Sequence, residues 1–341
     1  MSQLSEYFTT LLLKYLFFIL IFTTSCTING QHYIHFTPSS FSNKFSLNVA
    51  PVLKIHEGDT VATETVDASG ADKNGIKKAR GGNPLTGPFY IENSSVGDIL
   101  AITFTKISLN RSYAFTTENF VARSLPKEIT EQFKKPKIIK WKLDSKNNFA
   151  SPDTSYEHLQ FFKVPIKPFI GCVGVAPSNN KNEILSFFQG NFGGNLDFSS
   201  VKQSSTIYLP VFHDGAFLFL GDAHAEQGDG ELAGNALETS MNIEFTVRII
   251  KAPAYSLTFP RVEDSNYIMA MGIAKSLDDA LKFATQNLVD CLQNDYKLSI
   301  QEASQVISTS VEYVIAEIAD PDVEIVARIK KEILQGLKKQ Q

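Results

Sequence analysis

Carboxylates, one histidine and four glycines are concentrated in the stretch GDAHAEQGDGELAGNALE, residues 221–238. If the apolar strand before this stretch continues to residue 224, Asp222 and His224 point to the same face, because alternate residues of a strand do so. A carboxylate and an imidazole on one face provide two ligands for a metal such as Zn²⁺. A hairpin tip in water has the same composition, and a single D-x-H pair alone favours that simpler interpretation.

Three other loops have a similar polar and glycine-rich character. They are ETVDASG at 64–70, GGNPLTGPF at 81–89 and FQGNFGGNLDF at 188–198. Each is compatible with ordinary turns, in which glycine, asparagine and aspartate are common. Together, four such loops are what a ligand pocket at one end of a β-sandwich requires.

Several established motifs are absent from the sequence. It has no G-x-G-x-x-G loop, no G-x-S-x-G elbow, no C-x-x-C pair and no H-E-x-x-H motif. The segment DAHAEQ lacks the glycine at the sixth position of an EF-hand loop. The formal net charge is −4 without a long run of one sign, which argues against a nucleic-acid-binding protein, because such a protein has a basic face.

The elements that must position these loops are mainly strands. Segment 242–250 alternates between apolar and polar residues, which is the pattern of a half-buried strand. Further short segments bounded by turn residues predict a sandwich or a barrel. Residues 109–160, in which Phe and Lys are frequent and Pro126 and Pro136 interrupt the pattern, predict a surface excursion between strands.

The C-terminal part changes to a helical period. Ser276 is a predicted N-cap, and Ser299 with Glu302 forms a predicted capping box at the start of a second helix. The face of the first helix that is predicted to be buried carries Leu277, Leu281, Ala284, Leu288 and Cys291.

The predicted fold class is therefore α+β and β-rich, with a jelly-roll-like β-sandwich body and a C-terminal helical layer. The predicted domain spans residues 27–341. Its parts are a β-rich body over about 30–255, a helical part over about 265–320 and a last strand and helix over 322–338. Hydrophobic residues make up 43% of the 341 residues, which is enough for a substantial core.

Residues 1–26 have the pattern of a secretory leader. Lys14 precedes the apolar run YLFFILIF, which is shorter than the roughly 20 residues of a membrane-spanning helix. Cys26, after small residues, fits the lipid-attachment site of a bacterial lipoprotein. We therefore expect export, either to the bacterial periplasm after ordinary cleavage of the leader or as a membrane-anchored lipoprotein whose only membrane contact is a lipid anchor at Cys26. Cys172 and Cys291 are expected to be buried thiols.

Five ordered blocks of the sequence are similar to one known family. The longest, HDGAFLFLGDAHAEQGDGELAGNALETSMNIEFTVRIIK, follows the pattern G-D-x-H-A-x-Q-G-D-G-E-x-x-G-x-A-x-E. The others are ETVDA, NPLTGPFYIE with GDIL, GCVGVAP and GNFGGN. In these blocks the chain resembles the acetamidase/formamidase family, over residues from about 34 to about 329.

This resemblance implies hydrolysis of short-chain linear amides, such as formamide and acetamide, to a carboxylate and ammonia. It also implies a divalent metal, with Zn²⁺ as the first choice and Ca²⁺ as the alternative. By position in the matching blocks, the candidate metal ligands are Asp67, Asp222, His224 and Glu238. Many family members have His where this chain has Asn83, so this residue is expected to contact the substrate only.

The residue types then suggest a mechanism. The metal is expected to polarise the amide carbonyl and to activate a water molecule. Glu231, Glu226 or His213 would take the proton of this water and return it to the leaving nitrogen. The backbone N–H groups of Gly193, Gly194 and Asn195, or of the GDG segment, would bind the oxyanion.

The expected partner is a small amide, and the family resemblance implies a homo-oligomer, most simply a dimer. The alternative is a surface-anchored jelly-roll protein that holds a carbohydrate or another small ligand through a loop-borne metal, without turnover. A third interpretation keeps the amidase chemistry but changes the substrate to a longer or peptide-derived amide. The resemblance over nearly all of the mature chain favours an amidase over a binding protein.

Overall fold

The computed structural model describes residues 31–133, 135–178, 183–253 and 255–337. The predicted leader over residues 1–26, with Cys26, lies outside the described residues. Residues 32–341 form one compact unit, separate from residues 1–31. Within the described residues, no helix combines the length and the hydrophobicity needed to cross a membrane.

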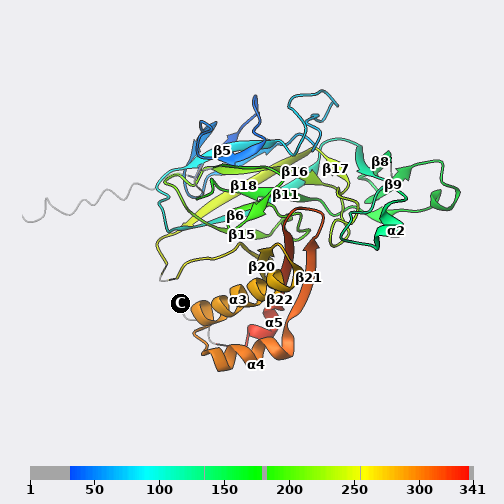
Figure 1. Cartoon of the computed structure of the whole chain (residues 1–341). Helices are drawn as coiled ribbons and strands as arrows, with labels where there is room; N and C mark the ends of the chain where they lie inside the picture. The colour runs from blue at the N-terminus through cyan, green and yellow to red at the C-terminus, as the bar shows by residue number, and fades with distance from the viewer. Residues whose placement is uncertain (1–30, 134, 179–182, 254, 338–341) are drawn as a thin grey trace, which may run out of the picture. The chain divides into compact units, whose positions relative to one another are not determined.

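One large sheet joins strands from the N-terminal part of this unit to the C-terminal strands β20, β21 and β22 (Figure 1). In the described part of the chain it has nine strands in the order β1-β4-β18-β6-β15-β19-β20-β22-β21. Their bounds are β1 Tyr33–His35, β4 Thr60–Glu64, β6 Ile99–Leu109, β15 Thr206–Pro210, β18 Met241–Ile250, β19 Arg261–Glu263, β20 Tyr267–Ala274, β21 Glu312–Glu317 and β22 Val323–Lys330. Burial alternates along β18, as the sequence pattern predicts.

A second sheet carries the polar loops. Eleven described strands form it, with the path β10-β9-β8-β7-β17-β16-β11-β14-β13 and with β5 and β3 attached beside β16. Their bounds are β3 Leu53–Ile55, β5 Leu85–Ile91, β7 Tyr113–Thr117, β8 Ile138–Asp144, β9 Phe149–Asp153, β10 Val164–Pro165, β11 Phe169–Gly174, β13 Gln189–Gly190, β14 Gly193–Asn195, β16 Leu218–His224 and β17 Glu238–Thr239. A short pair joins β2 Lys44–Ser46 to β12 Glu183–Leu185.

The two large sheets pack face to face around an aromatic core. Phe89 of β5 meets Phe245 of β18 edge-to-face, with 5.3 Å between the ring centroids. Such edge-to-face pairs between aromatic rings add to the stabilisation from burial. The prediction of a β-rich α+β fold is therefore confirmed, whereas the jelly-roll order of its strands stays a prediction.

The C-terminal helices α3 Leu277–Tyr296 and α4 Ile300–Ser310 cover β20 and β22 (Figure 1). Both predicted caps are present: Ser276 accepts a hydrogen bond from Asp279 N–H, and Ser299 and Glu302 form the capping box. The predicted buried face of α3 is partly wrong, because Leu277 and Leu281 are exposed. Small residues of α3 face the sheet instead, because α3 lies directly against the backbone of Gly272 in β20.

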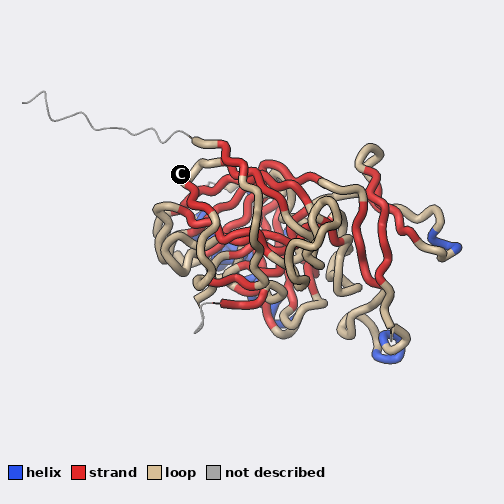
Figure 2. Tube along the Cα trace, turned by 90° about the horizontal axis from the view of Figure 1, so that it is seen from above, coloured by secondary structure: helices blue, strands red, loops and turns tan. Residues whose placement is uncertain are grey.

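The excursion predicted over residues 109–160 extends the second sheet outwards. Strands β7, β8, β9 and β10 pair in succession, and the short helices α2 Lys127–Thr130 and η1 Glu157–Leu159 lie in its connections. Figure 2 shows this extension beside the rest of the strands, on the right of the view. We call residues 113–165 the β7–β10 extension.

A buried ion pair fixes the start of β17. Arg111 Nη1 lies 2.8 Å from Asp67 Oδ2, and both side chains are 2% exposed. The two atoms make an ionic contact without hydrogen-bond alignment. Arg111 also donates to Thr239 Oγ1 at 2.9 Å and to the carbonyl oxygen of Glu238 at 3.3 Å. One guanidinium thus ties the loop after β4 to the strand that carries Glu238.

Removal of this guanidinium should destabilise the fold. In Arg111→Met the carboxylate of Asp67 stays buried without its counter-charge, which typically costs about 3–5 kcal/mol of unfolding free energy. The double variant Arg111→Met/Asp67→Asn should regain part of this loss, because it removes the uncompensated charge. Urea unfolding of both variants measures the difference. An unfolding free energy of Arg111→Met equal to that of the wild type would contradict the role assigned to the pair.

Candidate functional site

The site is built at the end of β16, a strand with every residue buried. His224 is the last residue of β16 and pairs with Glu238 of β17 and with Phe169 of β11. Asp222 has a left-handed backbone, with φ of 53°, so β16 is not regular here. Its side chain nevertheless converges on the imidazole, as the D-x-H spacing predicts.

Two carboxylates face Nε2 of His224. Asp222 Oδ1 lies 3.5 Å and Glu238 Oε2 lies 3.3 Å from this nitrogen. One ligand atom from each of the three residues lies within 4.8 Å of the others. Asp222 and His224 come from β16 and Glu238 comes from the start of its neighbour, so the register of the sheet creates this group.

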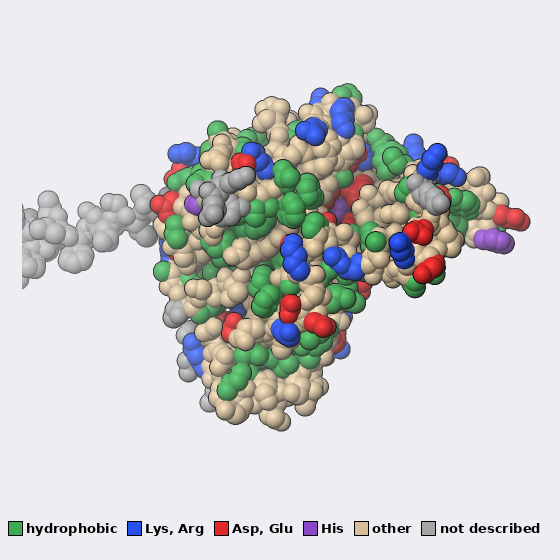
Figure 3. All heavy atoms as spheres, viewed as in Figure 1, with side chains coloured by type: hydrophobic (Ala, Val, Ile, Leu, Met, Phe, Trp, Pro, Cys, Tyr) green, Lys and Arg blue, Asp and Glu red, His purple; other side chains and the backbone are tan. Residues whose placement is uncertain are grey.

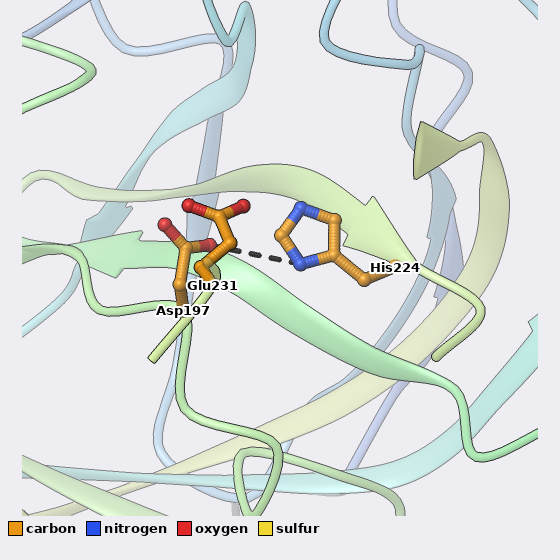
Figure 4. Close-up of side chains that lie close together, drawn as sticks. All are labelled: Asp197, His224 and Glu231. Atoms are coloured by element: carbon orange, nitrogen blue, oxygen red, sulfur yellow. Dashed lines mark ion pairs between the residues drawn. The ribbon is translucent and has the colours of Figure 1, made fainter. Parts of the chain in front are cut away.

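Two further carboxylates lie near the same ring, one of them beside Nδ1. Asp197 Oδ1 is 3.6 Å from Nδ1, and Glu231 completes a second group with the same 4.8 Å spacing. Figure 4 shows the carboxylates of Asp197 and Glu231 together on one side of the His224 ring. The imidazole therefore lies between two pairs of carboxylates.

Asparagine side chains hold these carboxylates in place. Asn195 Nδ2 donates to Asp197 Oδ2 at 2.6 Å and to Asp320 Oδ2 at 3.0 Å. Asn83 Nδ2 donates to Asp222 Oδ2 and to Asn195 Oδ1, both at 3.0 Å. Asn83 thus contacts a predicted metal ligand directly.

The charges of the site are unbalanced. Burial raises the pKa values of Asp197, Glu231 and Glu238, and neighbouring carboxylates add to the effect. Burial alone would lower the pKa of His224, but Glu238 and Asp222 outweigh it and raise that pKa well above its usual value. Four buried carboxylates share one imidazole, so the site favours a cation.

Several atoms of the site have no hydrogen-bond partner within the described residues. They are Asp197 Oδ1, Asp222 Oδ1, Glu238 Oε2 and both ring nitrogens of His224. Gly171 of β11 leaves the space beside them open, since a Cβ atom there would contact Asp197 Oδ1 and lie 2.7 Å from His224 Cε1. Unpaired nitrogen and oxygen donors around an open space are suitable for a divalent metal such as Zn²⁺.

The structure places the other predicted residues in different surroundings. Asp67 is paired with Arg111, and Glu226 lies 3.4 Å from Lys167. His213 precedes β16, whose seven residues span roughly 20 Å at about 3.3 Å per residue. It is therefore at the opposite end of this strand from His224, and its Nε2 lies 3.1 Å from the carbonyl oxygen of Pro177.

Gly193 and Gly194 lie in β14, between β11 and β13. Both have positive φ values, of 91° and 115°. A Cβ atom on either would collide with backbone atoms of a neighbouring strand. These glycines therefore allow the close strand packing that places Asn195 in the site.

Asp197 and Asp320, which are not among the candidate site residues predicted from the sequence, also line the site. Asp197 follows Asn195 by two residues in a loop already noted for its polar character, so a local signal existed. Asp320 follows β21 and does not lie in one of the polar, glycine-rich loops noted in the sequence. Its segment reaches the site because Gly230 N–H donates to Ala316 O and Ile318 N–H donates to Gly230 O, both at 3.1 Å.

Cys172 of β11 lies beneath these residues. Its thiol is 2.7 Å from Asn195 Oδ1 and 3.7 Å from Asp222 Oδ2. Burial, with Asp222 and Asp197 nearby, raises the pKa of this thiol well above its usual value. Cys172 therefore stays protonated and is a poor nucleophile, because the thiolate is the reactive form.

Two cavities reach the carboxylate cluster from outside. One of about 440 Å³ is lined by Asn83 and Glu238, and one of about 360 Å³ by Glu231. Both include Thr116 and Asn235 in their walls. Figure 3 shows acidic side chains at the bottom of a hollow between the β7–β10 extension and the rest of the surface.

Comparisons with known proteins agree with this architecture. An acetamidase from Mycolicibacterium smegmatis is 43% identical over 60 residues, which are 17% of this chain and 15% of that relative. The chain thus matches only a small part of this curated relative's length. The crystal structure of an acetamidase from Yersinia enterocolitica superposes with a TM-score of 0.75 and 28% sequence identity. The match includes 89% of this chain and 94% of the Yersinia chain.

A second solved structure shows the same fold. It is a recombinant predicted acetamidase/formamidase from Thermoanaerobacter tengcongensis, with 23% sequence identity and a TM-score of 0.77. The match includes 90% of this chain and 98% of the Thermoanaerobacter chain. A sequence model of the Acetamidase/Formamidase family matches residues 28–186 and 189–333. With this match over most of its length, the chain belongs to the Acetamidase/Formamidase family.

Proposed function

We propose that this protein is a metal-dependent amidase that hydrolyses the C–N bond of a linear amide to a carboxylate and ammonia. The observation that carries the proposal is the buried group of Asp222, His224 and Glu238, whose unpaired atoms lie within 4.8 Å of one another. Membership of the Acetamidase/Formamidase family supports the same reaction class.

The ligand set that we propose is Asp222, Glu238 and Nε2 of His224. Asp197 beside Nδ1 would then hold the ring, as carboxylates hold metal-binding histidines in other proteins. A nitrogen donor favours Zn²⁺ over Ca²⁺, which takes 6–8 oxygen ligands. When bound, the metal ion would polarise the amide carbonyl and make a water molecule more acidic.

Glu231 is the proton carrier that we favour. Its buried carboxyl lies beside the ring of His224, and burial raises its pKa, which brings that pKa closer to the range where a group both accepts and donates protons. Glu231 would take the proton of the attacking water and deliver it to the amide nitrogen, which must be protonated before it leaves. His213 is at the far end of β16, and Glu226 is engaged by Lys167.

The first test concerns the metal. Purified wild-type protein should retain Zn²⁺ in stoichiometric amount after gel filtration, and Asp222→Ala or His224→Ala should lose it, because each removes a proposed ligand. Asp229→Ala is the matched control, since Asp229 is an exposed acid of the same loop. Elemental analysis measures the content, and circular dichroism checks that each variant is folded. Unchanged Zn²⁺ in both ligand variants would show that the site is wrongly assigned.

The second test concerns the proton carrier. Glu231→Gln should lower kcat for ammonia release by about 10²–10⁴-fold, the usual contribution of general acid–base catalysis, while Zn²⁺ stays bound. Glu226→Gln is the comparison, with an expected loss of less than about tenfold. If Glu226→Gln causes the larger loss, Glu226 is the proton carrier instead. Binding of Zn²⁺ and amides without any ammonia release would support the binding-protein alternative.

A further inference from the structure

The cavity of about 360 Å³ beside Glu231 has a mainly apolar wall. We call it the aromatic pocket and define it by Phe120, Trp141, Phe162, Val164, Leu232 and Leu237, with Glu231 at its polar end. Trp141 and Val164 belong to the β7–β10 extension, whereas Leu232 and Leu237 belong to the loop between β16 and β17. The pocket thus lies between the extension and a loop that carries a proposed catalytic residue.

The fold leaves much of this apolar surface uncovered. Phe120 is 38%, Leu232 is 41% and Phe162 is 46% exposed. Trp141 and Phe162 meet edge-to-face, with 6.2 Å between the ring centroids. A single exposed apolar side chain is normal, but several around one concave surface are typical of a binding site.

Polar atoms in the wall of the pocket lack partners. The indole N–H of Trp141 is buried and has no acceptor within the described residues, and Gln227 Oε1 and Asn235 Oδ1 have no donor there. A buried tryptophan N–H usually finds a hydrogen-bond partner. These three atoms are themselves buried, so the surface that the pocket offers to a ligand consists mainly of its apolar side chains.

Size and charge restrict what the pocket takes. Ligand pockets that hold molecules of drug size have volumes of about 300–1,000 Å³, and the 360 Å³ here far exceeds a formamide of three heavy atoms. None of the described residues that line it is Lys, Arg or His, whereas Glu226, Asp229 and Glu231 do line it. A carboxylate-bearing substituent would be repelled, and a neutral apolar one would be accepted.

We propose that the aromatic pocket is a specificity subsite for a neutral aromatic or branched alkyl substituent of the amide, with Trp141 as its main contact. This inference rests on the proposed amidase function and names its substrate class: primary amides with an apolar side group, in preference to formamide and acetamide. The substituent would lie against Trp141 while the amide group faces the cluster around His224.

Trp141 is the single tryptophan of the chain, so its fluorescence reports on this pocket. Titration of the Zn²⁺-loaded protein with phenylacetamide should give a saturable fluorescence change, and acetamide at the same concentrations should give none. Phe161→Ala is the control, because Phe161 is 95% exposed and does not line the pocket. It should behave like the wild type. A fluorescence response to acetamide equal to that to phenylacetamide would contradict the subsite.

Kinetics test the selectivity. We expect kcat/KM for phenylacetamide to exceed kcat/KM for acetamide by at least about tenfold. One methylene group more or less in a hydrophobic pocket already changes kcat/KM by about 10–200-fold. Trp141→Ala should remove most of this preference, because it should lower kcat/KM for phenylacetamide much more than kcat/KM for acetamide. An analogue with a carboxylate on the ring should be a poor substrate. Equal losses for both amides in Trp141→Ala would overturn the proposal.

Two further results separate the possible failures. Loss of selectivity in Ile138→Ala, but not in Trp141→Ala, would assign the substituent to the 440 Å³ cavity that Ile138 lines and overturn the aromatic pocket. If no amide releases ammonia, the proposed amidase function fails. In that case a fluorescence response to phenylacetamide still supports the subsite, and its absence rejects the subsite as well.

Discussion

The structure depends on one electrostatic constraint: four carboxylates are buried around a single imidazole. Asp197, Asp222, Glu231 and Glu238 lie at the end of β16 with one cationic partner, His224. Removing an ionised carboxylate from water is costly unless it is paired or bound to a metal. The raised pKa values of Asp197, Glu231 and Glu238 reflect the same imbalance. A divalent cation at Nε2 of His224 would resolve it.

The fold maintains this arrangement with parts from distant regions. Gly171 keeps the space beside His224 open, and the pairing of β16 with β17 brings Glu238 to the imidazole. Asp320, from the segment between β21 and β22, reaches Asn195 across 125 residues of sequence. The C-terminal part is therefore a wall of the site as well as a helical layer.

Local patterns explain why part of the site could be predicted. Asp222 and His224 lie two residues apart at the end of one strand, and the Ser276 N-cap, the Ser299–Glu302 capping box and the alternation of β18 are equally local. Glu238 was selected through family resemblance, whereas its contact with His224 depends on the register between two strands. The pairing of Asp67 with Arg111 and the role of Asp320 depend on tertiary contacts, which no local pattern contains. The buried face of α3 differs from the predicted one because α3 packs closely against Gly272. This contact leaves room for the small side chains of Ala280 and Ala284, whereas Leu281 is exposed.

The ligand set proposed for the metal ion is the part of the site that can be tested most directly. X-ray absorption spectroscopy of the Zn²⁺-loaded protein separates nitrogen and oxygen ligands from sulfur, and it identifies imidazole by its outer-shell scattering. We expect a nitrogen and oxygen shell with one imidazole and without sulfur, although the thiol of Cys172 is 3.7 Å from Asp222 Oδ2. A sulfur ligand, or a spectrum without imidazole, would contradict the assignment of Asp222, His224 and Glu238.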